Sequence, residues 1–419
     1  MKFKSNAHGD IVTGIDIGTS SIKIVVARRN SERAELLYVS KEPSAGLRHG
    51  AIVDIPEAAQ SIRRALMGAE KISKAALKNI YISIGTAQAK MQSSRGIVAV
   101  SSADTQIYQA DMDRAVRASQ AVNLSQNRMI VHTLTKEFIV DGMGDISDPL
   151  GLAGSRLEVQ SLIIDAFSPH VKGLIHAVEL AGGEVGGLVF SPLVAARGAL
   201  SRKQKELGTA IVDIGFSTTG LAVYEEKKPV LAVKFPVGAD HVSRDVAVGL
   251  KIPLDAAENI KLHYGSALAK EVGAKDSIEL KKFIMEAKGS VQLRSIAEII
   301  ESRLEEIFDF VNNELRAAGK YGNLPGGIVL VGGGAKLPGL ADLVKQEVKL
   351  SAQIGCSIAD EWQNEGGVFK EALEDPEFVC AFGLALWGIY GEKSAQEELA
   401  PSGFAGKYGI KKFIRYFTP

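Results

Sequence analysis

The sequence predicts an α/β protein built from two related halves, and three segments support this prediction. Near the start of the chain, an apolar strand ends at Asp16-Ile17-Gly18-Thr19 and another follows from Ile22, which is the pattern of a β-hairpin. The pattern returns near the middle, where a strand from Thr209 ends at Asp213-Ile214-Gly215 and a Ser/Thr-rich turn follows. A third segment, Ile328–Val331, is an apolar strand that runs into three consecutive glycines. The repeated hairpin indicates two halves of similar structure.

Composition excludes several classes of protein. The 419 residues suffice for two or more domains, and 23% charged and 46% hydrophobic residues are ordinary for a globular chain. Acidic and basic residues number 49 each, which argues against a general nucleic-acid binder, because such proteins are net positive. Two cysteines and seven scattered histidines provide neither a disulfide framework nor a metal-binding spacing. We therefore expect a reducing compartment and no metal site made of side chains alone.

The chain shows no export signal and no membrane-spanning segment. Its first residues, MKFKSNAHGD, lack the apolar core of a signal peptide. No stretch reaches the roughly 18–20 apolar residues that a spanning helix needs, and the longest candidate, Val379–Tyr390, is typical of a buried helix. We expect a protein that is neither exported nor membrane-spanning.

Two peripheral units are predicted beside the halves. Between the hairpins, residues 86–165 have a different pattern of elements. Short strand-like segments surround a helix containing Asp111 and Ala115, and a Gly/Asp-rich loop covers 141–151. This pattern predicts an inserted small α/β lobe. Residues 264–289 are rich in charge and poor in apolar side chains, which indicates a second lobe at the periphery.

The two hairpins have the chemistry of a phosphate clamp. Tight turns of Gly, Ser and Thr present backbone N–H groups and hydroxyls to an anion. An acid at the end of the preceding strand, Asp16 or Asp213, can hold Mg²⁺ through water, since Mg²⁺ keeps much of its hydration shell. Lys23 has the reach and charge for a phosphate. One such hairpin is an ordinary turn, but two about half a chain apart predict a clamp on the two sides of a phosphate chain.

The glycine-rich third segment, Gly332–Lys336, allows close backbone approach to a flat ligand, and a helix start nearby favours phosphate. Such a turn is also a common packing solution, so its meaning depends on the two hairpins before it. The chain has no G-x-x-x-x-G-K-[ST] loop and no G-x-G-x-x-G after its first strand. The predicted nucleotide site is therefore of the two-hairpin type.

This set of motifs resembles the actin, Hsp70 and sugar-kinase superfamily and, within it, the FtsA family of actin-like bacterial cell-division proteins over nearly the whole chain. Supporting segments are 46–54, 138–142, 148–151, 236–241 and 257–261, of which Asp148-Pro149-Leu150-Gly151 is the most specific. The resemblance implies an actin-like fold with two RNase H-like cores. The implied units are a first core (10–85 and 166–205), an inserted lobe (86–165), a second core (206–240 and 306–390), a small peripheral lobe (241–305), a linker (391–405) and an amphipathic helix (406–419).

The resemblance also implies ATP with Mg²⁺ in a central cleft. The resemblance assigns the metal's water shell to Asp16 and Asp213. It assigns the phosphates to Gly18, Thr19 and Lys23 on one side and to Gly215, Ser217 and Thr218 on the other. The adenosine would contact Gly332, Gly333, Gly334, Ala335 and Lys336, and the ribose and base would contact Glu258 and Lys261. Relatives usually have a second glycine and a later acid in the second turn, where this chain has Phe216 and Gly220. We therefore expect slow hydrolysis or none, and the sequence identifies no catalytic base.

The C-terminal residues predict a membrane anchor. In a helix from Gly406, one face gathers apolar side chains and the rest is basic, with no acid after Glu398. The apolar residues are Ile410, Phe413, Ile414 and Phe417, and the basic ones are Lys407, Lys411, Lys412 and Arg415. Such a helix binds the surface of an anionic membrane. The alternative is a helix docked on the protein's own core, but the polar linker and the resemblance favour the membrane.

The resemblance finally implies a function. The chain would self-polymerise, tether FtsZ filaments of the Z ring to the cytoplasmic face of the membrane at the septum, and recruit later division proteins through the inserted lobe. The C-terminal peptide of FtsZ would bind the lobe at 241–305. Two alternatives stay open, a PilM-like actin homologue of a pilus or secretion platform and a metabolic kinase of the superfamily. Outside these sites, Trp362 and Trp387 are expected in the core or at its edge, and His241 is expected to be a loop capping residue rather than a catalytic one.

Overall fold

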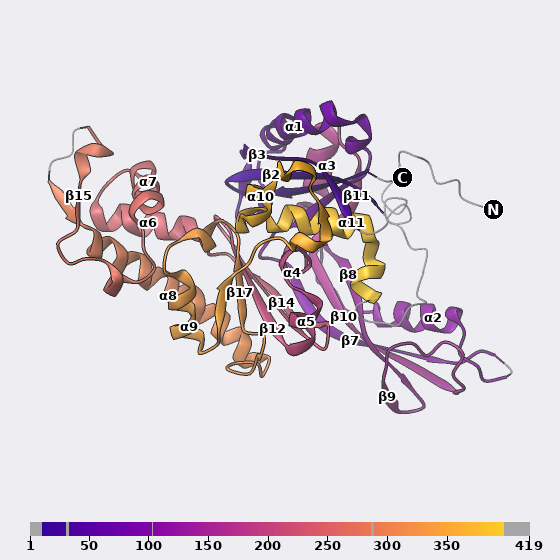
Figure 1. The fold of residues 1–419 in the computed structure, drawn as a ribbon. Coiled ribbons are helices and arrows are strands. Elements are labelled where there is room, and N and C mark those ends of the chain that lie inside the picture. Colours follow the sequence, from indigo (N-terminus) through magenta and orange to yellow (C-terminus); the bar gives the residue numbers. More distant parts are fainter. Residues whose placement is uncertain (1–10, 31–32, 103, 286–288, 398–419) are drawn as a thin grey trace.

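The computed structural model describes residues 11–30, 33–102, 104–285 and 289–397 of the chain. The predicted amphipathic helix at 406–419 and the linker residues 398–405 lie outside the described residues. Figure 1 shows a central body with one lobe at each end. Within the described part of the chain, no helix has both the length and the apolar character to cross a bilayer.

The first core is a six-stranded sheet in the order β11-β6-β1-β2-β3-β19, with helices on both faces. Its strands are β1 (Ile11–Ile17), β2 (Ser21–Arg28), β3 (Ala34–Pro43), β6 (Ile80–Ile84), β11 (Val185–Phe190) and β19 (Trp362–Gln363). Helices α1 (Ile55–Ile72) and α3 (Ser168–Leu180) cover one face, and α11 (Val379–Glu397) covers the other. Because both faces are covered, β1 is apolar except for Thr13 and Asp16, and Asp16 is its one residue that is not fully buried.

The second core repeats this plan with five strands in the order β14-β13-β12-β17-β18. Its strands are β12 (Thr209–Ile214), β13 (Thr219–Glu225), β14 (Lys228–Phe235), β17 (Ile328–Val331) and β18 (Ala352–Ile354). In both cores the hairpin strands pair antiparallel, and the first strand of the hairpin also has a parallel neighbour. Helices α8 (Leu293–Ala317) and α9 (Leu340–Val348) pack on one face, and α4 (Ser191–Ala199) packs on the other. The predicted actin-like α/β fold with two related cores is confirmed.

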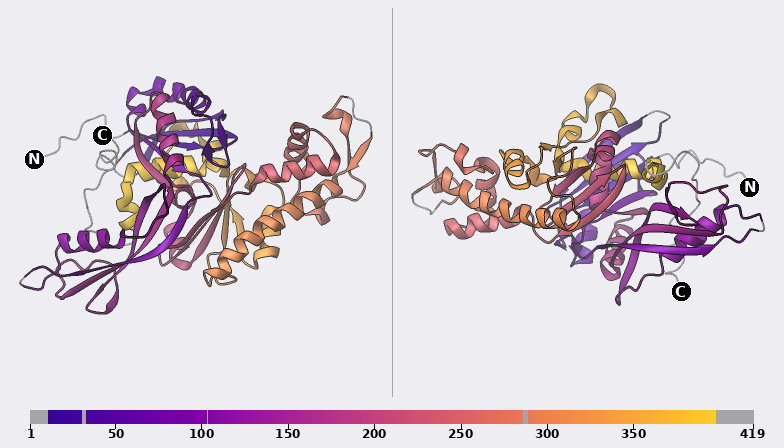
Figure 2. Two further views of the ribbon diagram at one scale, coloured as in Figure 1. Left: turned by 180° about the vertical axis from the view of Figure 1, so that it is seen from behind. Right: turned by 90° about the horizontal axis from the view of Figure 1, so that it is seen from below.

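The inserted lobe is an antiparallel sheet in the order β7-β10-β8-β9, with α2 (Gln109–Ser119) on one face. Its strands are β7 (Lys90–Ala99), β8 (Arg128–Val140), β9 (Met143–Ile146) and β10 (Arg156–Phe167). Both views in Figure 2 show it projecting away from the cores. In the Asp-Pro-Leu-Gly loop, the Asp148 carboxylate accepts the Leu150 N–H at 3.0 Å, and Gly151 has a φ of 80°. The glycine therefore permits a turn that side-chain-bearing residues resist.

The other lobe lies at the opposite end of the molecule in Figure 1. It consists of α6 (Ala239–Leu250), α7 (Leu254–Tyr264), the short pair β15 (Ser277–Glu279) and β16 (Ser290–Gln292), and the first turns of α8. His241 Nδ1 accepts the N–H of Gly238 at 3.3 Å, so this histidine caps the start of α6, as predicted. Trp362 and Trp387 are buried, also as predicted.

Helix α1 ends at Ile72, because Ser73 adopts extended backbone and a 3₁₀ turn follows over Lys74–Leu77. The end of α11 differs from the sequence prediction. Helix α11 continues to Glu397, with a break in the helical backbone at Gly391, whose φ is 76°. Helical structure therefore extends into the first part of the segment that was predicted as a linker.

Helix α11 lies between the two cores and packs at van der Waals distance through glycines. A methyl group at Gly14 of β1 would lie 2.5 Å from the Ala381 carbonyl oxygen and 2.6 Å from the Ala385 nitrogen. A methyl group at Gly383 would lie 2.2 Å from the Val194 carbonyl oxygen of α4. Backbone atoms cannot move aside as flexible side chains do, so these glycines set how closely α11 approaches β1 and α4.

We predict that Gly14→Ala destabilises the protein by about 1–3 kcal/mol, because the added methyl group overpacks the contact between β1 and α11. Denaturant unfolding followed by tryptophan fluorescence measures the change. The control is Gly173→Ala in α3, where a methyl group meets nothing within 4 Å and helix propensity favours alanine. Equal midpoints for wild type and Gly14→Ala would contradict the prediction.

Candidate functional site

The two predicted hairpin turns meet between the cores. Ser217 Oγ in the second turn donates a hydrogen bond to Thr19 Oγ1 in the first turn at 2.8 Å, across 198 positions of sequence. Thr19 Oγ1 also accepts the N–H of Gly50, at 3.3 Å. The first turn is closed by the Gly18 N–H bonding to the Ser21 carbonyl, and the second by the Gly215 N–H bonding to the Thr218 carbonyl. The same local structure therefore presents hydroxyls from two sides of one place.

The first hairpin sets a lysine beside its carboxylate. The β1–β2 register places Lys23 directly opposite Asp16, and Lys23 Nζ lies 3.6 Å from Asp16 Oδ2. Ser83 Oγ, at the end of β6, donates to Asp16 Oδ1 at 3.0 Å. Burial alone would lower the pKa of Lys23, but the charges of Asp16 and Glu377 outweigh it and the pKa is raised. Lys23 is therefore charged at neutral pH.

The second hairpin has an equivalent aspartate, Asp213, but the lysine beside it comes from a different strand. Asp213 ends β12 opposite Gly220, and Lys234 Nζ from β14 lies 3.9 Å from Asp213 Oδ2. Cys380 Sγ of α11 is 3.7 Å from the same oxygen. Burial raises the pKa of Asp213, and the Lys234 charge offsets only part of that effect. Sequence reasoning missed Lys234 and Cys380, because one belongs to a strand and the other to an apolar helix.

The glycine-rich segment passes directly beside the second hairpin. A methyl group at Gly332, whose φ is 86°, would lie 2.4 Å from Asp213 Oδ1, and one at Gly334 would lie 2.4 Å from Ile214 Cγ2. These two glycines are thus required by packing alone. A methyl group at Gly333 would make only van der Waals contact with Glu377, at 3.8 Å, so packing does not require a glycine here. A 3₁₀ turn over Gly333–Lys336 follows the strand, and α9 begins only at Leu340.

Glu377 is the central charged residue that the sequence did not reveal. Its carboxylate lies 3.5 Å from Lys23 Nζ, 2.8 Å from Lys41 Nζ and 3.0 Å from Lys336 Nζ. It therefore joins the first hairpin to the glycine-rich segment, where Lys336 also bonds Asp375 at 2.6 Å. Burial would raise the pKa of Glu377, but the lysines outweigh burial and lower its pKa to about 2. Its segment, Asp375-Pro376-Glu377, has only the pattern of a helix start, so no local signal predicted this role.

Glu258 and Lys261 lie on α7, at the side of the same region. Lys261 Nζ lies 2.8 Å from Glu258 Oε2 and donates to the Ala239 carbonyl at 3.1 Å, and the Ala239 N–H bonds the Gly215 carbonyl at 2.9 Å. Beyond α7, the Ala267 N–H bonds the carbonyl of Pro338, which closely follows the glycine-rich segment. The structure thus places α7 against both the second turn and the third segment.

We predict that Glu377→Gln lowers the free energy of unfolding by roughly 1–3 kcal/mol at pH 7. The folded pKa of about 2 is below the ordinary 4.5, so this carboxylate contributes stability above pH 4.5 that is lost as the pH falls toward 2. Urea unfolding at stepped pH should show the gap between wild type and variant closing below pH 4.5.

The matched control is Glu374→Gln, because Glu374 forms only an exposed pair with Lys370, at 3.7 Å. That variant should match wild type at every pH. A gap for Glu377→Gln that stays constant from pH 7 to pH 3 would rule out the assigned charge interactions.

Two family models match the chain. The one described as "Cell division protein FtsA" matches residues 210–383, and the one described as "SHS2 domain inserted in FTSA" matches residues 86–165. Among solved structures, the PilM–PilN type IV pilus biogenesis complex has a TM-score of 0.66 at 19% identity, covering 90% of this chain and 98% of that chain. MreB5 of Spiroplasma citri bound to ADP has a TM-score of 0.54 at 13% identity, covering 94% of this chain and all of that chain (100%). These two likenesses concern the fold alone.

Curated relatives match over most of their length. Cell division protein FtsA of Bacillus subtilis is 32% identical over 90% of this chain and 83% of the relative, and that of Borreliella burgdorferi is 32% identical over 90% and 91%. The Escherichia coli protein is 28% identical over 94% of each chain. An identity of 32% over nine-tenths of the residues, together with a separate match for the insertion, means that the chain belongs to the FtsA family of cell division proteins.

Proposed function

We propose that this protein binds ATP with Mg²⁺ between its cores, polymerises, and tethers FtsZ filaments of the Z ring to the cytoplasmic face of the membrane at the division septum. The observation behind this proposal is the contact of the two hairpin turns, Ser217 Oγ to Thr19 Oγ1 at 2.8 Å, in a member of the FtsA family. Two facing turns of this kind form a clamp for a phosphate chain, and the clamp joins the two halves of the molecule.

The donors around the turns fit a polyphosphate and a hydrated divalent cation. Hydroxyls of Thr19 and Ser217 and the ammonium of Lys23 are phosphate donors, and the carboxylates of Asp16 and Asp213 can hold water on Mg²⁺. The adenosine would lie along Gly332–Lys336, where packing does not require the glycine at 333, with Glu258 and Lys261 near the ribose and base. MreB5 of Spiroplasma citri, which shares the fold, has been solved with ADP and with AMPPNP.

ATP would act mainly as a conformational ligand. In the second turn, Gly220 occupies the place where relatives usually have an acid, so one group that could orient metal or water is missing. Slow hydrolysis or none follows from this loss, because proton transfer from an attacking water needs a positioned base. We propose that ATP binding gates assembly of the filament.

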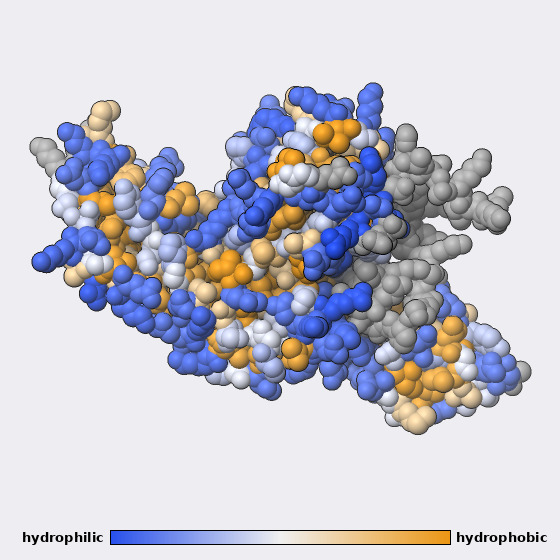
Figure 3. All heavy atoms as spheres, in the orientation of Figure 1, coloured by the Kyte–Doolittle hydropathy of each residue, from blue (hydrophilic) through white to orange (hydrophobic). Residues whose placement is uncertain are grey.

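Attachment and recruitment would use the ends of the molecule. The basic, amphipathic residues 406–419 would bind anionic lipid, and many weak anchors in one polymer would bind together tightly. The lobe at 241–305 would receive the C-terminal peptide of FtsZ, and the inserted lobe at 86–165 would contact later division proteins. Figure 3 shows apolar side chains gathered on the inserted lobe, where Met143, Leu150 and Leu152 are exposed. Exposed apolar groups of this kind are typical of interaction surfaces.

For nucleotide binding, we predict that Lys23→Met weakens the affinity for a fluorescent ATP analogue in Mg²⁺ by about 10–100-fold, because a charge-assisted phosphate contact is lost. Lys41→Met is the matched control, since Lys41 also contacts Glu377, at 2.8 Å, but does not pair with Asp16. Equal losses for both variants would mean that the effect passes through Glu377 rather than through the phosphates.

For membrane attachment, we predict that the full chain co-sediments with anionic vesicles in ATP and Mg²⁺, while a chain truncated after Ala405 does not. Neutral vesicles should retain less of the full chain, because basic residues add roughly 1 kcal/mol each near an anionic surface. Phe413→Glu on the apolar face should abolish sedimentation, whereas Lys412→Gln should only weaken it. If the full chain stays in the supernatant, the terminus is not an anchor and a pilus-platform or kinase role gains support.

A further inference from the structure

The two hairpins obtain a lysine in different ways. In the first hairpin, the residue opposite Asp16 is Lys23 itself. In the second, the residue opposite Asp213 is Gly220, which has no side chain, and Gly220 is paired in turn with Lys234 on β14. The lysine of the second half therefore comes from one strand further out.

Because Gly220 has no side chain, the Lys234 side chain can extend past it toward Asp213. A methyl group at Gly220 would lie 3.3 Å from Pro192 Cγ, 3.8 Å from Asp213 Cβ and 3.9 Å from Lys234 Nζ, so this glycine lies between the carboxylate and the ammonium. Lys234 Nζ is 3.9 Å from Asp213 Oδ2, close to the 3.6 Å that separates Lys23 Nζ from Asp16 Oδ2. The two halves thus hold equivalent Asp–Lys pairs that are built through different registers.

The Lys234 ammonium lies where the two cores meet. Its side chain is only 6% exposed, and Nζ donates to Ser191 Oγ of α4 at 2.8 Å. A methyl group at Gly85, just after β6 of the first core, would lie 3.9 Å from the same nitrogen. Burying a lysine is costly unless its charge is compensated, and the residues on either side of Lys234 in β14 are apolar. Packing alone therefore does not explain a lysine at this position.

We propose that Lys234 is a resident cation of the phosphate site, which neutralises Asp213 and makes nucleotide binding less dependent on a divalent metal. This inference rests on the proposed ATP site. Gly220 adds no charge opposite Asp213, and the positive charge beside this carboxylate is that of Lys234. A polyphosphate bound here would therefore meet a positive charge that belongs to the protein.

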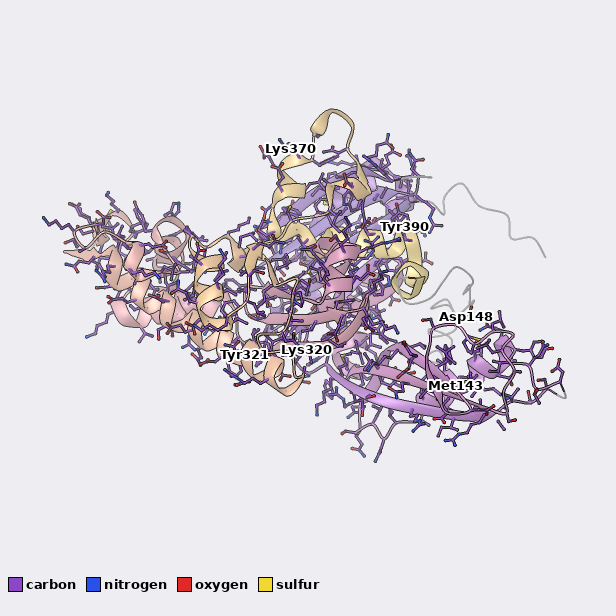
Figure 4. All side chains as sticks on the ribbon, turned by 60° about the horizontal axis from the view of Figure 1, so that its bottom comes forward. Met143, Asp148, Lys320, Tyr321, Lys370 and Tyr390 are labelled. Atoms are coloured by element: carbon purple, nitrogen blue, oxygen red, sulfur yellow. The ribbon has the colours of Figure 1, made fainter. Side chains whose placement is uncertain are left out.

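The test compares affinity for a fluorescent ATP analogue in excess Mg²⁺ and in excess EDTA, using the full chain. Wild type should lose less than about tenfold on removal of the metal, and Lys234→Met about 100-fold or more. Gly220→Asp keeps the lysine but adds an acid, and it should also raise metal dependence. The control is Lys320→Met: Lys320 follows α8 (Figure 4) and pairs with Glu225 at 2.6 Å, so this variant should match wild type.

The outcomes separate this inference from the ATP site itself. If wild type does not bind the ATP analogue in Mg²⁺, both the proposed ATP site and the proposed role of Lys234 are wrong. If wild type binds in Mg²⁺ but is lost in EDTA, or if Lys234→Met shows the wild-type ratio of the two affinities, the role of Lys234 falls and the ATP site stands. A thermal shift of Lys234→Met without a change in that ratio also overturns the inference, and Gly220→Asp decides the question if Lys234→Met does not fold.

Discussion

The close packing of α11 between β1 and α4 is the constraint on which the arrangement of the site depends. Gly14, Gly198 and Gly383 remove the side chains that would hold these backbones apart, since a methyl group at Gly198 would also lie 2.4 Å from the Val379 carbonyl oxygen. The start of the same helix and the 3₁₀ turn before it, Pro376–Phe378, reach the second hairpin and the third segment: Cys380 lies against Asp213, and the Pro376 carbonyl accepts the Gly332 N–H. The helix that joins the cores therefore also positions the residues between them.

Charge in the site is set by geometry rather than by residue type. Glu377 has its pKa lowered to about 2 because three lysines approach it, whereas the pKa of Asp213 is raised because burial, together with the charge of Asp16, outweighs the charges of Lys234 and Lys23. Acids of similar intrinsic strength thus differ within one cleft. On the proposed function, the carboxylate whose charge is least compensated, Asp213, is the one that gains most from a cation, whether that cation is a metal ion or Lys234.

Local patterns predicted the hairpin strands, the repeated hairpin and the glycine-rich turn, because each depends on neighbouring residues. The actin-like fold followed from the family resemblance that these motifs carry, and the structure confirms it. Glu377 and Lys234 could not be predicted, because one lies in a helix-start pattern and the other alternates with apolar residues on a strand. Their roles arise from contacts across 354 positions, between Lys23 and Glu377, and across strands whose register the sequence does not state. Gly220 was recognised as a departure from relatives, but the lysine that fills its place appears only when β13 and β14 are paired.

The arrangement also suggests why a ligand between the cores would affect the whole molecule. The lobes lie at opposite ends in Figure 1, and the proposed nucleotide lies between them, at turns that belong to different cores. A small rotation of one core on the other about α11 and α4 would displace both lobes, as in hinge and shear motions around ligands. On the proposed function, nucleotide binding would change assembly without hydrolysis, because the two lobes lie at opposite ends of the molecule. Different contacts with the two turns in the free and bound states are sufficient.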